Sequence, residues 1–86
     1  MKSSISAVVI NYNGKDYLDK CLRELIKHDE LSEIIVVDDA STDGSSELVR
    51  EKYKNAKLII NPKNSGPVYS RQRGFEKTFD KHNILW

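Results

Sequence analysis

The sequence predicts an α/β fold, with an open, mainly parallel sheet of three to four strands and helices on both faces. Two observations support this prediction. Short apolar, β-branched runs alternate with segments of helical periodicity, in the order β-α-β-α-β-α-β along the 86 residues, and this alternation is typical of parallel sheets. The clearest strand, Glu33–Asp38, contains four consecutive apolar residues, which indicates burial on both faces of the sheet.

The first two elements are a strand over Ile5–Ile10 and an amphipathic helix. The strand ends at Asn11–Gly14 (NYNG), a cluster of turn-forming residues. From Lys15 to about His28, apolar residues recur at helical spacing and share one stripe: Leu18, Cys21, Leu22, Leu25 and Ile26. Asn13 or Asp16 is predicted to cap the start of this helix.

A shorter helix is predicted over Ser45–Tyr53, with Asp43 as its N-cap. The third strand is Lys57–Ile60, closed by Asn61 and Pro62.

A third helix begins near Pro67, a residue that suits the first helical turn. Val68, Phe75 and Phe79 are predicted on its buried side. Ile84–Trp86 is predicted to begin a fourth strand. Because the sequence ends three residues into this strand, we interpret the chain as the front portion of a larger α/β domain.

Composition narrows the classes of function. The chain has 14 basic and 13 acidic residues, a net charge of +1, so no bulk attraction to nucleic acid is expected. The single cysteine, Cys21, excludes an internal disulfide framework. The apolar run before Asn11 is too short for a signal-peptide core or a membrane-spanning helix. We therefore expect a soluble, cytoplasmic chain with no nucleic-acid partner and no membrane segment.

The loops that follow the first three strands carry residues suited to a nucleotide. Ligands of open parallel sheets bind at the carboxyl ends of the strands, where this chain has Tyr12, the pair Asp38 and Asp39, and Arg71. An aromatic ring stacks on a base for roughly 1–3 kcal/mol. A carboxylate accepts hydrogens from a base or ribose, and an arginine pairs with phosphate or a base edge.

Simpler interpretations remain open for these loops. Tyr12 is equally consistent with packing beside the first helix, Asp43 is favoured as a helix cap, and Arg73 as a solvated helix residue. The sequence contains neither G-x-G-x-x-G nor G-x-x-x-x-G-K-[ST], so it supports neither a dinucleotide site nor a P-loop. It supports no nucleophile or general base, so no catalytic residue is predicted.

Three motifs resemble the amino-terminal part of the family-two glycosyltransferases, which adopt the Rossmann-like GT-A fold. They are VVINYNG at Val8–Gly14, EIIVVDDASTDGS at Glu33–Ser45, and NSGPVYSRQRG at Asn64–Gly74. The second matches the family signature almost residue for residue. The third is similar to N-x-G-x-x-x-A-R-N-x-G, but Ser70 replaces the usual Ala and Gln72 the usual Asn.

The resemblance implies transfer of a sugar, with inversion, from a UDP-linked donor to an acceptor hydroxyl. In this relation Tyr12 lies against the base, Asp39 accepts the hydrogen of a base ring nitrogen, and Arg71 approaches the nucleotide. The complete set of nucleotide-binding residues that it implies is Ile10, Asn11, Tyr12, Asp38, Asp39 and Arg71.

The resemblance also implies a divalent metal, Mn or Mg, held by a D-x-D motif that would follow Trp86. The family's catalytic base would lie further on as well. We therefore expect residues 1–86 to be the amino-terminal nucleotide-sugar-binding portion of a truncated glycosyltransferase domain, inactive alone, with no metal ligands of its own.

Two alternatives remain. One is a non-catalytic module that forms homo-oligomers through its exposed last strand. The other is a response-regulator-like receiver domain, which the acid pair also resembles. It is less favoured because the pair here follows the second strand rather than the first.

Overall fold

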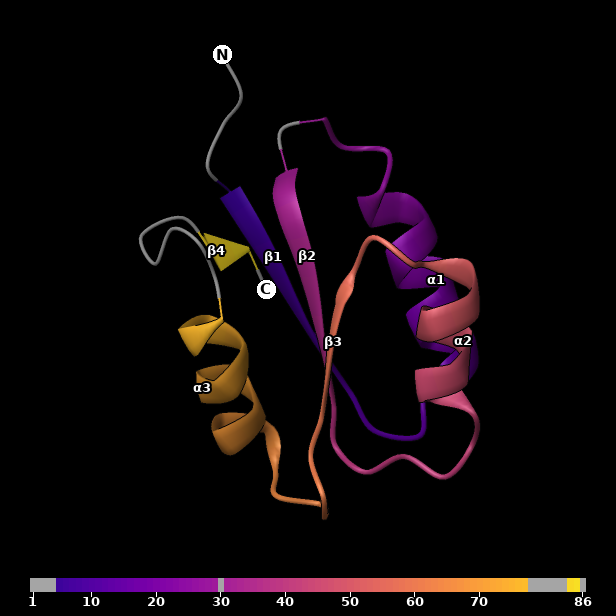
Figure 1. The fold of residues 1–86 in the computed structure, drawn as a ribbon, viewed down its shortest axis with the longest axis vertical. Helices are drawn as coiled ribbons and strands as arrows, with labels where there is room; N and C mark the ends of the chain where they lie inside the picture. The colour runs from indigo at the N-terminus through magenta and orange to yellow at the C-terminus, as the bar shows by residue number, and fades with distance from the viewer. Residues whose placement is uncertain (1–4, 30, 78–83, 86) are drawn as a thin grey trace.

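Within residues 5–29, 31–77 and 84–85, which are those the computed structural model describes, four strands form one sheet in the order β3-β2-β1-β4 (Figure 1). Every neighbouring pair is parallel, so the predicted α/β sheet is confirmed. The strands are β1 (Ile5–Asn11), β2 (Leu31–Asp38), β3 (Lys57–Ile60) and β4 (Ile84–Leu85).

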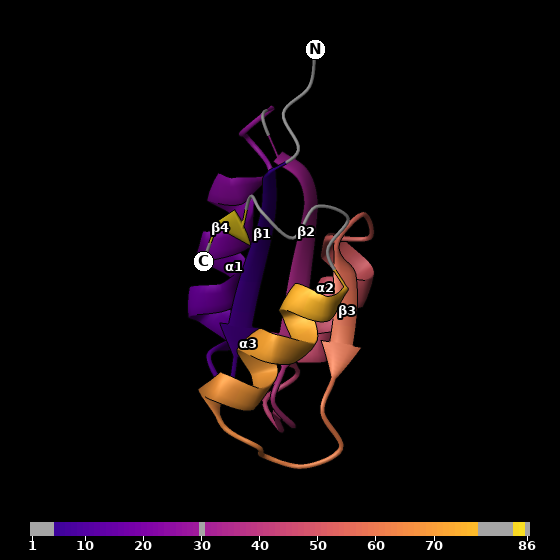
Figure 2. The same ribbon diagram turned by 90° about the vertical axis from the view of Figure 1, so that its left-hand side faces the viewer.

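Helices cover both faces of the sheet, as predicted. Helices α1 (Lys15–Leu25) and α2 (Ser45–Lys52) lie on one face and α3 (Pro67–Glu76) on the other (Figures 1 and 2). None of these described helices combines the length and the apolar character needed to cross a bilayer.

The continuous apolar run of β2 supplies both cores, because successive side chains of a strand point to opposite faces. Val36 packs with Leu18, Leu22, Val49 and Tyr53 on the face of α1 and α2. On the other face, the buried cluster consists of Val8, Ile35 and Val37. All the side chains in these two clusters are buried.

Helices α1 and α2 are joined by polar contacts that converge on Asp19. The Tyr53 hydroxyl donates to Asp19 Oδ1 at 2.5 Å and to the Asp19 carbonyl at 3.0 Å. Lys52 Nζ lies 2.9 Å from Oδ1, and Arg23 Nη2 lies 2.9 Å from Oδ2. The hydrogen bond from Tyr53, followed by that from Lys52, lowers the pKa of Asp19 to about 2. The two helices therefore hold each other in place beside the loops that precede them.

The predicted buried side of α3 is wrong for Val68, whereas Phe75 is half-buried. Val68 is 74 % exposed, and the buried residues of this helix are Ser70 and Gly74. A Cβ on Gly74 would collide with Cγ1 of Val8 and lie 3.2 Å from Cγ2 of Val37. The helix therefore lies against the sheet through small residues rather than through large apolar ones. Phe79, also predicted on this side, falls outside the described residues.

Two element boundaries differ from prediction by more than one residue. Helix α1 ends at Leu25 rather than near His28, since the backbone closes into turns in which the amides of Lys27 and His28 donate to the carbonyls of Glu24 and Leu25. Strand β2 begins two residues earlier than Glu33, because Leu31 already pairs with Ile5.

Candidate functional site

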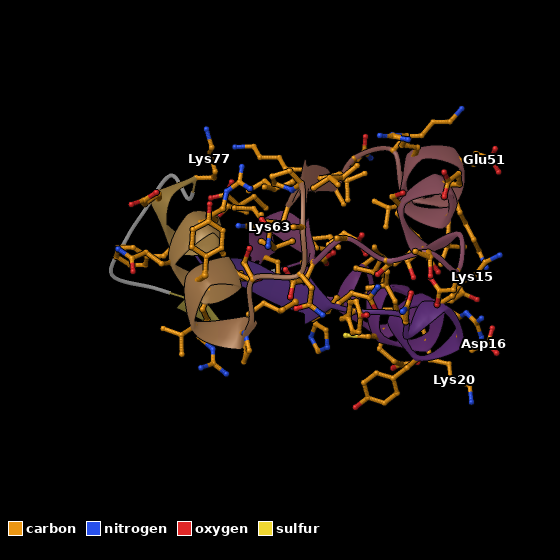
Figure 3. All side chains as sticks on the ribbon, turned by 90° about the horizontal axis from the view of Figure 1, so that it is seen from below. Lys15, Asp16, Lys20, Glu51, Lys63 and Lys77 are labelled. Atoms are coloured by element: carbon orange, nitrogen blue, oxygen red, sulfur yellow. The ribbon has the colours of Figure 1, made fainter. Side chains whose placement is uncertain are left out.

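The loops that leave the carboxyl ends of β1, β2 and β3 gather at one edge of the sheet, at the bottom of Figure 1. Figure 3 views this edge directly, with Lys63 of the β3–α3 loop between α3 and the layer of α1 and α2. All six residues predicted to bind a nucleotide belong to these strand ends, to the loops, or to the helix that follows them: Ile10, Asn11, Tyr12, Asp38, Asp39 and Arg71.

Asp38, the last residue of β2, is almost completely buried, at 1 % exposed. Its Oδ1 accepts hydrogen bonds from Asn11 Nδ2 at 3.0 Å and from Ser41 Oγ at 2.7 Å, and its Oδ2 accepts one from the Ser41 amide at 2.9 Å. Asp38 therefore links the end of β1 to the β2–α2 loop, and both of its carboxylate oxygens accept hydrogen bonds within the protein.

Asp39 is also buried, at 4 % exposed, and it reaches the opposite loop. Its Oδ1 accepts from Asn61 Nδ2 and from the Ser65 amide, both at 2.8 Å, and its Oδ2 accepts from the Gly66 amide at 3.0 Å. A carboxylate oxygen has two lone-pair sites. Within the described residues, Oδ2 uses one of them and keeps one acceptor position.

The charge state of Asp39 follows from opposing effects. Burial raises its pKa, but the hydrogen bonds from Asn61, Ser65 and Gly66 outweigh burial, so the pKa lies below its usual value. Asp39 is therefore an ionised acceptor at neutral pH, and a group with an N–H or O–H donor is its natural partner.

Sequence reasoning missed the residues that hold Asn61. This side chain is 1 % exposed, and its Nδ2 also donates to Ser70 Oγ at 2.9 Å, while its Oδ1 accepts from Arg73 Nη1 at 2.6 Å. Ser70 and Arg73 stand three residues apart, so they share one side of α3. That spacing, together with the polar residue directly after β3, is the signal that could have revealed the contact. Arg73 is thus bonded to the site rather than simply solvated.

Asp43 connects the first two loops. It was predicted as the N-cap of α2, but Gly44 occupies that position. Asp43 stands one residue earlier, and its Oδ1 accepts from the Ser45 amide at 3.1 Å. Its Oδ2 also accepts from the amide of Lys15, the first residue of α1, at 3.0 Å. The predicted capping of α1 by Asn13 or Asp16 is therefore wrong.

Asn13 has a different role, because its side chain crosses to the neighbouring loop. The side-chain Oδ1 accepts from the Thr42 amide at 2.7 Å, and the backbone amide of Asn13 donates to Ser41 Oγ at 2.8 Å. Its φ of 51° and that of Ala40, 63°, lie in the left-handed region, which is sparsely occupied by residues other than glycine.

Surface cavities adjoin this network. The Tyr12 ring is 53 % exposed, so it is not a core residue beside α1. Ile10 and the exposed Arg71 line one cavity of about 410 Å³, together with Ala7, Val8, Val9, Tyr17, Cys21 and Leu25. A second cavity, of about 370 Å³, lies at the start of α1 and includes Asn13 and Asp43. The edge thus combines an exposed aromatic ring, a buried ionised acceptor and an exposed guanidinium.

The described residues do not fit a divalent metal, which the family resemblance implies for a longer protein. No group of three His, Cys, Asp or Glu side chains among them could hold a metal ion. The two adjacent carboxylates, Asp38 and Asp39, accept hydrogen bonds from N–H and O–H donors of the protein. Mn²⁺ and Mg²⁺ instead require oxygen ligands directed at the ion.

The chain is similar in sequence to glycosyltransferases. The family model described as glycosyl transferase family 2 matches residues 6–86. An uncharacterized glycosyltransferase of Haemophilus influenzae is 38 % identical over 80 residues, which cover 85 % of this chain and 31 % of that protein. A cholesterol galactosyltransferase of Borreliella burgdorferi is 32 % identical over 89 residues, with coverages of 99 % and 25 %. The chain thus spans about a third or less of the length of these relatives.

The fold also matches a solved structure. The mannosyltransferase PcManGT from Pyrobaculum calidifontis, in complex with GDP-Man and Mn²⁺, aligns with a TM-score of 0.76 at 24 % identity. The alignment covers 88 % of this chain and 24 % of the mannosyltransferase chain, and it shows a shared fold.

Proposed function

Because the chain belongs to glycosyl transferase family 2, we propose that it is the amino-terminal, nucleotide-sugar-binding portion of a glycosyltransferase that uses a UDP-linked donor. The family match favours this hypothesis over a receiver domain. In the proposed reaction an acceptor hydroxyl attacks the anomeric carbon with inversion, the bond to the diphosphate breaks, and the nucleoside diphosphate leaves with the electron pair. The proposal keeps the cytoplasmic location expected from the sequence.

The observation that carries this proposal is the buried, ionised Asp39, whose backbone amide donates to the carbonyl of Asn11 at 2.8 Å, one residue before the exposed Tyr12. An acceptor without a proton favours a base that presents a ring N–H, as uracil and guanine do, and disfavours bases that present a lone pair there. Tyr12, which directly follows the strand bonded to Asp39, would stack on the base. Arg71 would meet the negatively charged part of the nucleotide.

The proposal assigns binding, and not transfer, to these 86 residues alone. The described residues supply no ligand set for a metal. In the related family a divalent metal supports departure of the diphosphate. We propose that in the whole protein it is held by residues other than those described.

The test is a titration of the chain with UDP and with GDP, followed by the NMR shifts of backbone amides. We expect weak binding, with a dissociation constant in the millimolar range, because a few contacts must offset the entropy of association. Replacing Tyr12 with Ala should weaken it by at least about fivefold through loss of stacking. Ile26→Ala, which shortens a side chain that is 59 % exposed at the carboxyl end of α1, is the control and should change little.

The proposal is contradicted if the shifts miss the surroundings of Tyr12, Asp39 and Arg71, or if Tyr12→Ala and Ile26→Ala weaken binding equally. Stronger shifts with GDP than with UDP would overturn the choice of UDP but leave the site in place.

Self-association is a second candidate, which can coexist with the first. In the described part of the chain, β4 lies at one edge of the sheet and pairs with β1 at Ser6 and Ala7. We propose that a second copy pairs with the outer edge of this last strand.

Light scattering should then show a mass that rises with protein concentration. Ile60→Lys, on the opposite edge strand β3, should leave this rise unchanged. A constant monomer mass would contradict self-association, and a rise lost in Ile60→Lys would place it on the other edge.

A further inference from the structure

We propose that Asn61 and Arg73, with Ser70, position the carboxylate of Asp39 for the nucleobase. This inference rests on the proposed function, in which Asp39 accepts a hydrogen from the base ring. Asn61 and Arg73 are positioning residues, because they act on Asp39 and not on the ligand.

The donors and acceptors allow only one orientation of the Asn61 amide. An ionised carboxylate only accepts hydrogen bonds, and a guanidinium only donates them. Nδ2 of Asn61 must therefore face Asp39, at 2.8 Å, and Oδ1 must face Arg73 Nη1, at 2.6 Å. Because Asn61 is 1 % exposed, no water-facing rotamer competes with this arrangement. Arg73 thereby fixes which edge of the amide meets Asp39.

Ser70 completes the set. The Asn61 amide nitrogen has two hydrogens, of which one is directed to Asp39 and the other to Ser70 Oγ at 2.9 Å. Ser70 is fully buried, so an alanine at this position would leave a buried N–H without an acceptor. The hydroxyl therefore holds the amide in the plane that reaches Asp39 Oδ1.

The bridging amide also leaves an acceptor position on Oδ2 of Asp39 for a ligand. Arginine pairs directly with carboxylates through two parallel hydrogen bonds, which engage both oxygens. Here the positive charge of Arg73 reaches the buried negative charge through a neutral amide, so Oδ2 retains its acceptor position. The Arg73 guanidinium is itself placed by the Tyr69 ring, whose centroid lies 5.9 Å from Cζ.

The test compares two nucleotides that differ only at the base ring nitrogen. In 3-methyl-UDP a methyl group replaces the ring N–H, so the ratio of its dissociation constant to that of UDP measures the contact with Asp39. We expect a ratio of about ten or more in the unmodified chain, typical of a hydrogen bond to a charged group. The same pair of measurements is made with GDP and 1-methyl-GDP, and all constants come from NMR titrations of the 86-residue chain.

Three variants separate positioning from folding. Arg73→Met keeps most of the side-chain length and should lower the ratio at least threefold, while Arg73→Lys keeps a donor and should restore part of it. Lys77→Met removes the same charge at an exposed position next to α3 and should leave the ratio unchanged. A purely structural role would weaken both nucleotides equally, which also leaves the ratio unchanged.

An unchanged ratio in a folded Arg73→Met variant would overturn the inference. If Arg73→Met does not fold, Ser70→Ala replaces it, and the same fall or constancy of the ratio decides. A ratio of one for both nucleotides in the unmodified chain would instead show that Asp39 does not read the base, which overturns that part of the proposed function and this inference with it.

Discussion

Replacing Asp39 with Asn is expected to remove measurable nucleotide binding and to lower the free energy of unfolding by about 2 kcal/mol. Three donors, Asn61 Nδ2 and the amides of Ser65 and Gly66, converge on this carboxylate. An asparagine offers one acceptor oxygen, and its own NH₂ would face a donor. The ionised acceptor proposed for the base ring is lost at the same time. Titration with UDP and unfolding by urea measure the two effects.

The same variant should change the response of the protein to acid. The pKa of Asp39 is lowered in the folded state, so its contribution to stability is present above the unfolded value of about 3.9 and is lost as the pH falls through the folded value. The unmodified chain should therefore lose more stability than Asp39→Asn between about pH 5 and pH 2.

Asp29→Asn, at an exposed position between α1 and β2, is the control for the loss of one carboxylate. If Asp39→Asn bound UDP as well as Asp29→Asn does, the role of Asp39 in the site would be wrong.

Replacing Gly74 with Ala should destabilise the protein by about 1–3 kcal/mol, although alanine is favoured over glycine inside a helix by about 1 kcal/mol. The added Cβ would collide with Val8 Cγ1 and lie 3.2 Å from Val37 Cγ2. Since α3 rests on the sheet at this point, the helix must move outward or Val8 must shift. Urea unfolding monitored by circular dichroism measures the change.

Two further variants isolate the collision as the cause. Gln72→Ala, at an exposed position of the same helix, should change stability by less than about 0.5 kcal/mol. Val8→Ala makes room for the new methyl group, so the double variant Val8→Ala, Gly74→Ala should be more stable than the sum of the single effects predicts. Equal or greater stability of Gly74→Ala relative to the unmodified chain would contradict the close packing.

Sequence patterns predict the parts of the fold that depend on the spacing of apolar residues along the chain. The four apolar residues of β2 indicate a strand buried on both faces, and the stripe of α1 containing Leu18 and Leu22 indicates its buried side. In α3 the same reasoning fails, because it ranks Val68 above Ser70. Hydrophobicity does not report how near a helix lies to a sheet, and it is this distance that excludes large side chains at the contact.

The candidate site shows a similar division. The strand ends indicate which loops meet, and the six binding residues remain predictions that the titrations above will test. The residues that hold Asp39 and Asn61 were missed, because their polar spacing shows only where a contact could form and not which residues it joins. Asn61 reads as a turn residue, and Ser70 as a small change from alanine. Their role depends on β3, which brings Asn61 to Asp39 across 22 residues of chain, and on α3, which brings Ser70 to Asn61 across 9.

The hydrogen bonds between the three loops affect how fast a ligand would bind and how much conformational entropy binding would cost. Hydrogen bonds join the loops to one another or to the helix that follows, through the acceptors Ser41, Asp43 and Asp39. This edge of the sheet therefore acquires its shape when the domain folds. An arriving ligand would find a preorganised surface and lose only its own freedom, together with that of the few exposed side chains that close on it. Encounter would then be governed by diffusion and orientation rather than by slow rearrangement of the backbone.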